Sequence, residues 1–253
     1  MRHGVGVAVR AMWRPWHGLV VITALVLLGV DAGFRNPWTL VVSNTSAGSF
    51  CGLLAPLYLF ILKRDLFHPW EGLVGHRLGD TRTWWAVQTA AAGLYALGVT
   101  ATVIALSGVG PLVTGGWSWQ WGGLAAYEVG RHVVSTWRPW WWALDAFGLM
   151  AIGLWGMGAL LQVLSRWWRS AWIAWVALVV LNLLPLDLMY SVHDWLWWLP
   201  GPQFSLLEHW TFANAFPPSW SVLYGGVLLL GSTIWGFVTV TTTRWDTVHG
   251  GAL

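Results

Sequence analysis

The stretch Trp84 to Leu106, WWAVQTAAAGLYALGVTATVIAL, runs for 23 residues without a charged side chain. A helix of about 20 predominantly apolar residues is long enough to cross the hydrocarbon core of a bilayer. The Gly, Ala and Thr residues within it are typical of membrane helices that pack closely on their neighbours. This stretch therefore predicts a transmembrane helix, and it sets the fold class for the rest of the chain.

The composition of the whole chain agrees with that class. The protein is 57% hydrophobic and 9% charged, whereas a soluble domain has about 25% charged residues. A membrane β-barrel would show alternating polarity in segments of about ten residues, and the sequence has no such alternation. We therefore predict an all-α integral membrane protein.

The apolar runs predict six transmembrane helices in a single transmembrane domain of residues 1–253, and Pro56 is expected to kink the second span. A cleaved signal peptide is the alternative for the first span, because Val30-Asp31-Ala32 loosely fits a cleavage site. Asp31 fits such a site poorly, so we favour an uncleaved helix. The predicted spans are 17–33, 47–62, 84–106, 141–164, 171–189 and 220–240.

Basic residues in the connecting segments predict the orientation. With the N-terminus in the cytoplasm, ten basic residues lie inside and three, Arg35, Arg131 and Arg138, lie outside. This distribution follows the positive-inside rule, and the opposite orientation would violate it. Both termini are therefore predicted to be cytoplasmic, in a multi-pass topology.

The chain contains 25 tryptophans, many of them in clusters beside the apolar runs. Tryptophan prefers the membrane interface, where its ring and its N–H group are both satisfied. Interfacial anchoring is our interpretation, and aromatic boxes for a ligand are the alternative. The single cysteine, Cys51, has apolar neighbours in the sequence and is expected to be a small buried hydrophobic residue.

The residue types needed for catalysis are scarce. The only lysine, Lys63, follows Phe60-Ile61-Leu62 and so belongs to no phosphate-binding loop, and neither a zinc-binding His-Glu-x-x-His nor a Gly-x-Ser-x-Gly motif occurs. We predict that the chain alone is not an enzyme and binds no metal or cofactor. The small positive excess does not indicate nucleic-acid binding. The pairs His193-Asp194 and Glu208-His209 could bind a metal only if their loop folded back, and solvated loop residues are the alternative.

Polar residues within or near the spans suggest a polar path. Asp145, Asp187, Gln88 and Asn182 are the candidates, because burying a charge in a membrane costs several kcal/mol unless it is paired or hydrated. The alternative for the acids is a helix-end carboxylate with a hydrated partner.

Charge is concentrated between spans two and three, in LKRDLFHPWEGLVGHRLGDTRTWW, Leu62 to Trp85. The charge distribution predicts that this segment is cytoplasmic. It is interpreted either as an ordinary solvated loop or as a docking surface for a soluble partner. Its charged residues are Lys63, Arg64, Asp65, Glu71, Arg77, Asp80 and Arg82.

Two motifs in this region carry a resemblance. Pro56 to Asp65, PLYLFILKRD, ends the second span, and Arg77 to Trp85, RLGDTRTWW, leads into the third. In this order the features resemble the permease subunits of type-2 ABC transporters in their compact six-helix, exporter-like form. As a motif the resemblance covers about thirty residues, and as a topology it covers most of the chain.

The resemblance implies a permease in a bacterial cytoplasmic membrane that forms a homodimer or heterodimer. It implies that the charged residues of Lys63 to Thr83 couple the permease to a separate ABC-type ATPase chain, which would bind ATP and Mg²⁺. The substrate would move outward by alternating access. A membrane scaffold or accessory protein without a transport cycle and an intramembrane redox subunit are the alternative functions.

Overall fold

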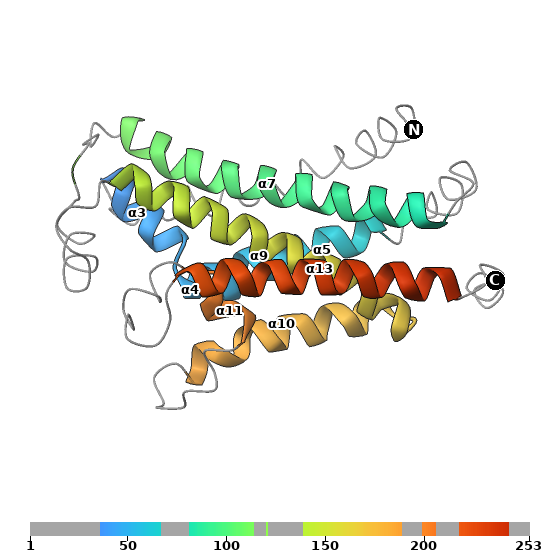
Figure 1. Ribbon diagram of the computed structural model, residues 1–253. Helices are drawn as coiled ribbons and strands as arrows, with labels where there is room; N and C mark the ends of the chain where they lie inside the picture. Colours follow the sequence, from blue (N-terminus) through green and yellow to red (C-terminus); the bar gives the residue numbers. More distant parts are fainter. Residues whose placement is uncertain are drawn as a thin grey trace.

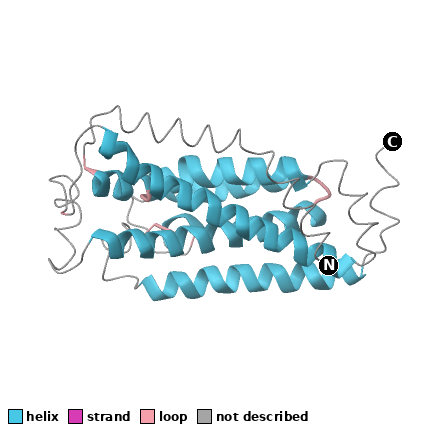
Figure 2. Ribbon diagram, turned by 90° about the horizontal axis from the view of Figure 1, so that it is seen from above, coloured by secondary structure: helices cyan, strands magenta, loops and turns pink. Residues whose placement is uncertain are grey.

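The computed structural model describes residues 36–66, 81–113, 120, 139–188, 199–205 and 218–242, and the elements within them are all helical. Figure 1 shows long helices lying side by side, and Figure 2 shows no strand in the described part of the chain. The elements are α3 (Pro37–Asn44), α4 (Ala47–Ser49), the π-helix η1 (Phe50–Leu54), α5 (Ala55–Leu66), α7 (Thr81–Val113), α9 (Pro139–Trp167), α10 (Ala171–Leu188), α11 (Pro200–Gln203) and α13 (Pro218–Thr242).

Three helices are long and apolar enough to cross a membrane, and their spanning segments are Arg82–Gly108, Trp140–Trp167 and Ser219–Thr239. A fourth results if α3 and the helix from Ala47 to Lys63 are counted as one bent span. The predicted fifth span corresponds to α10, a shorter apolar helix. The predicted span 17–33 lies outside the described residues. The structure thus accounts for three or four spanning segments among its described residues.

Residues 37–44 form a helix in the segment between the first and second predicted spans, where no helix was predicted. Asn36 caps α3 by accepting hydrogen bonds from the N–H groups of Trp38 and Thr39, and Pro37 occupies the first helical position. Both are favourable start signals, although the helix is only eight residues long. The structure therefore continues the apolar segment of the second predicted span towards the N-terminus.

Pro56 was predicted to kink the second span, but the sharp bend in this region lies elsewhere. It is a 55° change of direction between Asn44 and Ala47, where Ser46 caps the following helix. At Pro56 the chain remains helical, directly after the π-helical turn η1. Proline has no N–H to donate, and a π-helical turn is one of the known adjustments of helix hydrogen bonding next to such a position.

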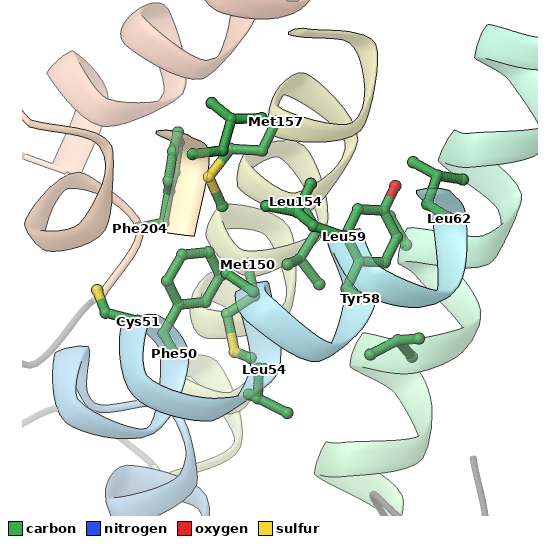
Figure 3. Close-up of a cluster of buried hydrophobic side chains, with 14 of the residues drawn as sticks. Phe50, Cys51, Leu54, Tyr58, Leu59, Leu62, Met150, Leu154, Met157 and Phe204 are labelled. Carbon is green, nitrogen blue, oxygen red and sulfur yellow. The ribbon is translucent and has the colours of Figure 1, made fainter. Parts of the chain in front are cut away.

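Helix α9 is the centre of the bundle and packs against α13, α7, α10 and α5. In an apolar 18-residue stretch of α9, 67% is buried inside the protein. The corresponding share in α13 is 17%, so α13 lies at the periphery. Figure 3 shows the main hydrophobic cluster, in which side chains of η1 and α5 face side chains of α9. Cys51 is fully buried in this cluster, as predicted.

The described tryptophans, which are predicted to anchor the protein at the membrane interface, differ in their exposure. Trp167 and Trp220 are exposed, but Trp85 and Trp142 are fully buried. The buried Trp85 ring fills the space above Gly236 and donates its indole N–H to the carbonyl of Thr233, at 3.1 Å. Burial is possible because a glycine leaves room for the ring and a helix carbonyl satisfies the indole N–H.

A second tryptophan joins two helices in the same way. The Trp155 ring of α9 lies against Gly93 of α7, and its indole N–H donates to the Thr89 carbonyl at 2.8 Å. About one turn further along α9, Gly158 faces Tyr58 of α5, whose hydroxyl donates to the Ala92 carbonyl of α7 at 3.0 Å. Aromatic rings placed on glycines therefore fix the packing of α5, α7, α9 and α13.

A tight turn joins α9 to α10. Ser170 N–H donates to the Ser165 carbonyl and Arg169 N–H to the Arg166 carbonyl, which is the hydrogen-bond pattern of a Schellman motif. Arg169 has φ 52°, the left-handed conformation in which glycine is usual. The side chain of Ser170 then accepts from Ile173 N–H at the start of α10. The turn makes α9 and α10 an antiparallel pair, as the very short predicted loop implied.

Candidate functional site

One end of the bundle carries the described basic residues. Here α5 ends at Leu66, α7 begins at Thr81, α9 ends at Trp167, α10 begins at Ala171 and α13 ends at Thr242. Figure 1 shows these helix ends together on the right. We call this the basic end. The charge distribution in the sequence predicts that it is cytoplasmic.

Lys63 lies within a cage of aromatic rings at the basic end. Its Nζ atom is 2.6 Å from the ring centroid of Trp172, 4.8 Å from that of Phe60 and 5.5 Å from that of Trp175. The rings meet edge to face, with centroids 5.8 to 6.2 Å apart. The side chain is 6% exposed, and Nζ has no hydrogen-bond partner in the described structure. Lys63 therefore joins the end of α5 to the start of α10.

Arg166 at the end of α9 has a similar environment. Its guanidinium carbon lies 4.4 Å from the Trp84 ring and 4.5 Å from the Trp85 ring, and its NH2 group donates to Gln88 Oε1 at 3.4 Å. Gln162 Nε2 donates to the Gln88 carbonyl, also at 3.4 Å. These contacts hold the first turns of α7 against the last turns of α9.

Helix α13 is attached to the same region. Trp85 donates to the carbonyl of Thr233, and Arg82 lies over the Phe237 ring at 5.3 Å. Arg82 itself is exposed. Residues 82 to 88 at the start of α7 therefore contact both α9 and α13.

The remaining residues of the predicted coupling set lie at the edge of the described residues or beyond them. Arg64 and Asp65 belong to α5, but their side chains are not among those described. Glu71, Arg77 and Asp80 lie outside the described residues. The structure thus characterises the two flanks of the charged segment, at Lys63 and at Arg82, rather than its middle.

The predicted path residues do not form one group. Gln88 belongs to the cluster with Arg166, whereas Asp145 is exposed on α9. Asn182 is fully buried on α10 and donates to the Leu178 carbonyl at 2.8 Å and to the Met157 sulfur at 3.0 Å. Its Oδ1 atom has no hydrogen-bond partner in the described structure. Asp187 lies in α10, and its side chain is not among those described.

The opposite end of the bundle, which we call the polar end, is held by uncharged groups. Asn44 donates to Ser107 Oγ at 2.9 Å, Ser205 to the Thr45 carbonyl at 3.2 Å and Ser221 to Gln203 Oε1 at 2.7 Å. Phe204 is buried between these contacts, with its ring against Gly153. The short α11 segment thereby links the bend at Thr45 to the start of α13.

Sequence reasoning did not single out the cage tryptophans, Arg166 or Gln162. Gln162 offered the clearest signal, because an amide in an apolar helix is usually paired with another helix. The pairs His193-Asp194 and Glu208-His209 lie outside the described residues. In the part of the chain that the structure describes, no group of three or more His, Cys, Asp or Glu residues could hold a metal ion.

Comparisons with known proteins give no relative. No family model, no curated protein and no solved structure matches this chain. Any functional conclusion therefore depends on the residues and their contacts.

Proposed function

We propose that this chain is a membrane-spanning permease subunit of an ATP-driven exporter, in which a separate ABC-type ATPase chain drives the movement of its helices. The ATPase would bind ATP and Mg²⁺ and would contact the permease through the segment Lys63 to Thr83. A second permease chain, identical or related, would complete the substrate path in a bacterial cytoplasmic membrane.

The observation that carries this proposal is the attachment of both flanks of the charged segment to the rest of the bundle. On one flank Lys63 contacts the α10 rings Trp172 and Trp175. On the other flank, Trp85 contacts Arg166 of α9 and Thr233 of α13. Force applied to the segment would therefore reach α5, α7, α9, α10 and α13 together.

A coupling element needs this kind of attachment, because coupling between distant sites is carried by packed side chains and rigid elements with two arrangements. An ordinary solvated loop needs no such contacts at its ends.

A pull-down tests the proposal directly. The tagged chain is isolated from its native membrane in mild detergent, and the eluate is analysed by mass spectrometry and assayed for ATP hydrolysis. The double charge reversal Glu71→Lys with Arg77→Glu is expected to abolish recovery of a phosphate-loop ATPase. The matched control is Glu128→Lys with Arg131→Glu, in a segment predicted to lie on the other side of the membrane, and it is expected to recover the ATPase.

Two results would contradict the proposal. The first is recovery of no ATPase with the folded wild-type chain, which would favour a membrane scaffold. The second is equal recovery of the ATPase with wild type and with the Glu71 and Arg77 reversal, which would make the segment an ordinary loop.

A further inference from the structure

The ammonium group of Lys63 is the starting point for a binding site at the basic end. Lys63 is 6% exposed, and its Nζ atom has no hydrogen-bond partner in the described structure. An ammonium group has three N–H donors, and aromatic faces attract its charge without accepting three directed hydrogen bonds. A buried charge without hydrogen-bond partners is costly. Among the described residues, the Lys63 ammonium group therefore lacks an acceptor.

The sign of the charge identifies the kind of ligand. An empty aromatic cage would suit a cationic ligand, but this cage already contains the chain's own ammonium group. Arg169 adds a second, exposed positive charge in the turn that precedes α10, three residues before Trp172. The missing partner is therefore an anion.

The wall of the cage that can open is Trp172. Trp175 is held in place by its indole N–H, which donates to the Pro56 carbonyl at 3.1 Å. Trp172 has no such hydrogen bond in the described structure and is 59% exposed. Rotation of its ring would uncover Lys63 Nζ and would also present the indole N–H as a further donor to an anion.

The position of the cage indicates where the anion comes from. Lys63 lies three residues before the end of α5, which corresponds to about 4.5 Å along the helix axis. Exposed tryptophans at this level, Trp167, Trp168 and Trp172, are typical of the headgroup layer of a membrane. Basic pockets between membrane helices at this depth bind the headgroups of anionic lipids.

We propose that Lys63, Trp172 and Arg169 form a binding site for the phosphate of an anionic phospholipid in the leaflet at the basic end. The lipid headgroup would pair with Lys63 Nζ and Arg169, and its acyl chains would lie along the exposed apolar faces of α5 and α10, where Phe60, Ile173 and Val176 are exposed. This site is independent of an ATPase partner and requires only that this end of the bundle meets a membrane surface.

Arg169 offers a test of the proposal that leaves the cage unchanged. It occupies a left-handed position, φ 52°, at which glycine would be less strained. The substitution Arg169→Gly removes the charge and relieves the backbone at the same time. A loss of lipid binding in this variant, with no loss of stability, would therefore report on the side chain alone.

The test measures bound lipid on the purified full-length chain. Native mass spectrometry counts dioleoylphosphatidylglycerol and dioleoylphosphatidylcholine retained from mixed micelles. We expect the wild-type chain to retain phosphatidylglycerol preferentially. Lys63→Met should lower the apparent affinity of the chain for phosphatidylglycerol about fivefold, and Arg169→Gly should lower it by a similar factor, which is the contribution of one charge near a membrane surface. Lys63→Arg is expected to keep most of the binding.

A control variant distinguishes the cage from a diffuse positive surface. Arg82→Gln removes a basic residue at the same end but away from the cage, and it is expected to bind phosphatidylglycerol like wild type. The thermal midpoint of each variant is measured in parallel, and methionine is expected to be tolerated at position 63 because a flexible thioether packs well against aromatic rings.

Three results would overturn the proposal. The first is unchanged lipid retention in both Lys63→Met and Arg169→Gly. The second is an equal loss of retention in Arg82→Gln, which would indicate a diffuse surface charge. The third is displacement of the lipid by millimolar inorganic phosphate, which would indicate a site for a soluble anion. If Lys63→Met does not fold, Arg169→Gly alone decides the outcome, because Arg169 is exposed.

Discussion

The two ends of this helical bundle are held together by different chemistry. At the basic end, Lys63, Arg82 and Arg166 lie against aromatic rings. At the polar end, short neutral hydrogen bonds such as those of Asn44 and Ser221 join the segments. Cation and ring contacts tolerate sliding because a ring face has no single acceptor position, whereas a hydrogen bond fixes distance and angle. The basic end also contains hydrogen bonds, such as that from Trp85 to the Thr233 carbonyl. Its cation and ring contacts nevertheless predict that it rearranges more easily than the polar end.

Truncation of Phe204 at the polar end should give the greatest loss of stability. Phe204→Ala removes a fully buried ring that lies against Gly153 and packs on Phe50. Truncation of a buried phenylalanine typically costs about 3 to 5 kcal/mol. We expect a loss of this size in the free energy of unfolding, measured by denaturation in mixed micelles. Leu223→Ala, at a side chain that is 58% exposed, should lie close to wild type, and an equal loss there would contradict a fixed polar end.

A glycine substitution tests the ring packing at the basic end. In Gly236→Ala the new methyl group would occupy the position of the Trp85 ring, which must then move and release the Thr233 carbonyl. Overpacking of this kind costs about 1 to 3 kcal/mol. Gly231→Ala on the same helix meets no atom within 4 Å and should not destabilise the protein. Equal thermal midpoints for the two variants would show that Trp85 is not held in place there.

The hydrogen bond between Asn44 and Ser107 provides a smaller and more local comparison. A double-mutant cycle with Asn44→Ala and Ser107→Ala isolates the interaction across the 2.9 Å contact. Polar pairs between membrane helices average about 0.6 kcal/mol in such cycles, and we expect a coupling free energy of this size. A coupling energy of zero would mean that the packing of Phe204, rather than hydrogen bonding, fixes the polar end.

The smallest effect is expected at Arg82. Its guanidinium group is exposed over the Phe237 ring, and exposed cation and ring pairs contribute about 0.5 to 1 kcal/mol. A cycle with Arg82→Gln and Phe237→Leu should give a coupling at the low end of this range. A coupling larger than that of Asn44 and Ser107 would reverse the proposed contrast between the two ends.

Helix bounds were the part of the fold that could be predicted best. The predicted spans 84–106, 141–164 and 220–240 lie within α7, α9 and α13, because a run of apolar residues between charged flanks has no other stable state in a bilayer. Helix α3 was missed, because an eight-residue helix is shorter than a membrane span. The bend at Thr45 and Ser46 could not be predicted, because it depends on contacts made by residues far along the chain, such as Ser205.

The candidate site was predicted less completely. The charge in Lys63 to Thr83 was visible in the sequence, and Gln88 was recognised as a polar residue in a span. Their partners were not visible. Arg166 lies 78 residues after Gln88, Thr233 lies 148 residues after Trp85, and Trp172, the partner of Lys63, lies on a different helix. No local pattern records which helices become neighbours.

The order of the amino acids was enough to predict that this chain forms apolar helices, where the longest of them lie, and that its charge gathers between the second and third predicted spans. These properties follow from composition and periodicity, which act on each segment separately. The burial of particular tryptophans, the glycines that receive their rings and the aromatic cage around Lys63, which has no acceptor among the described residues, emerged only from the folded chain. Those outcomes depend on the shapes of two surfaces that meet, and shape complementarity is a property of the pair of helices rather than of either one.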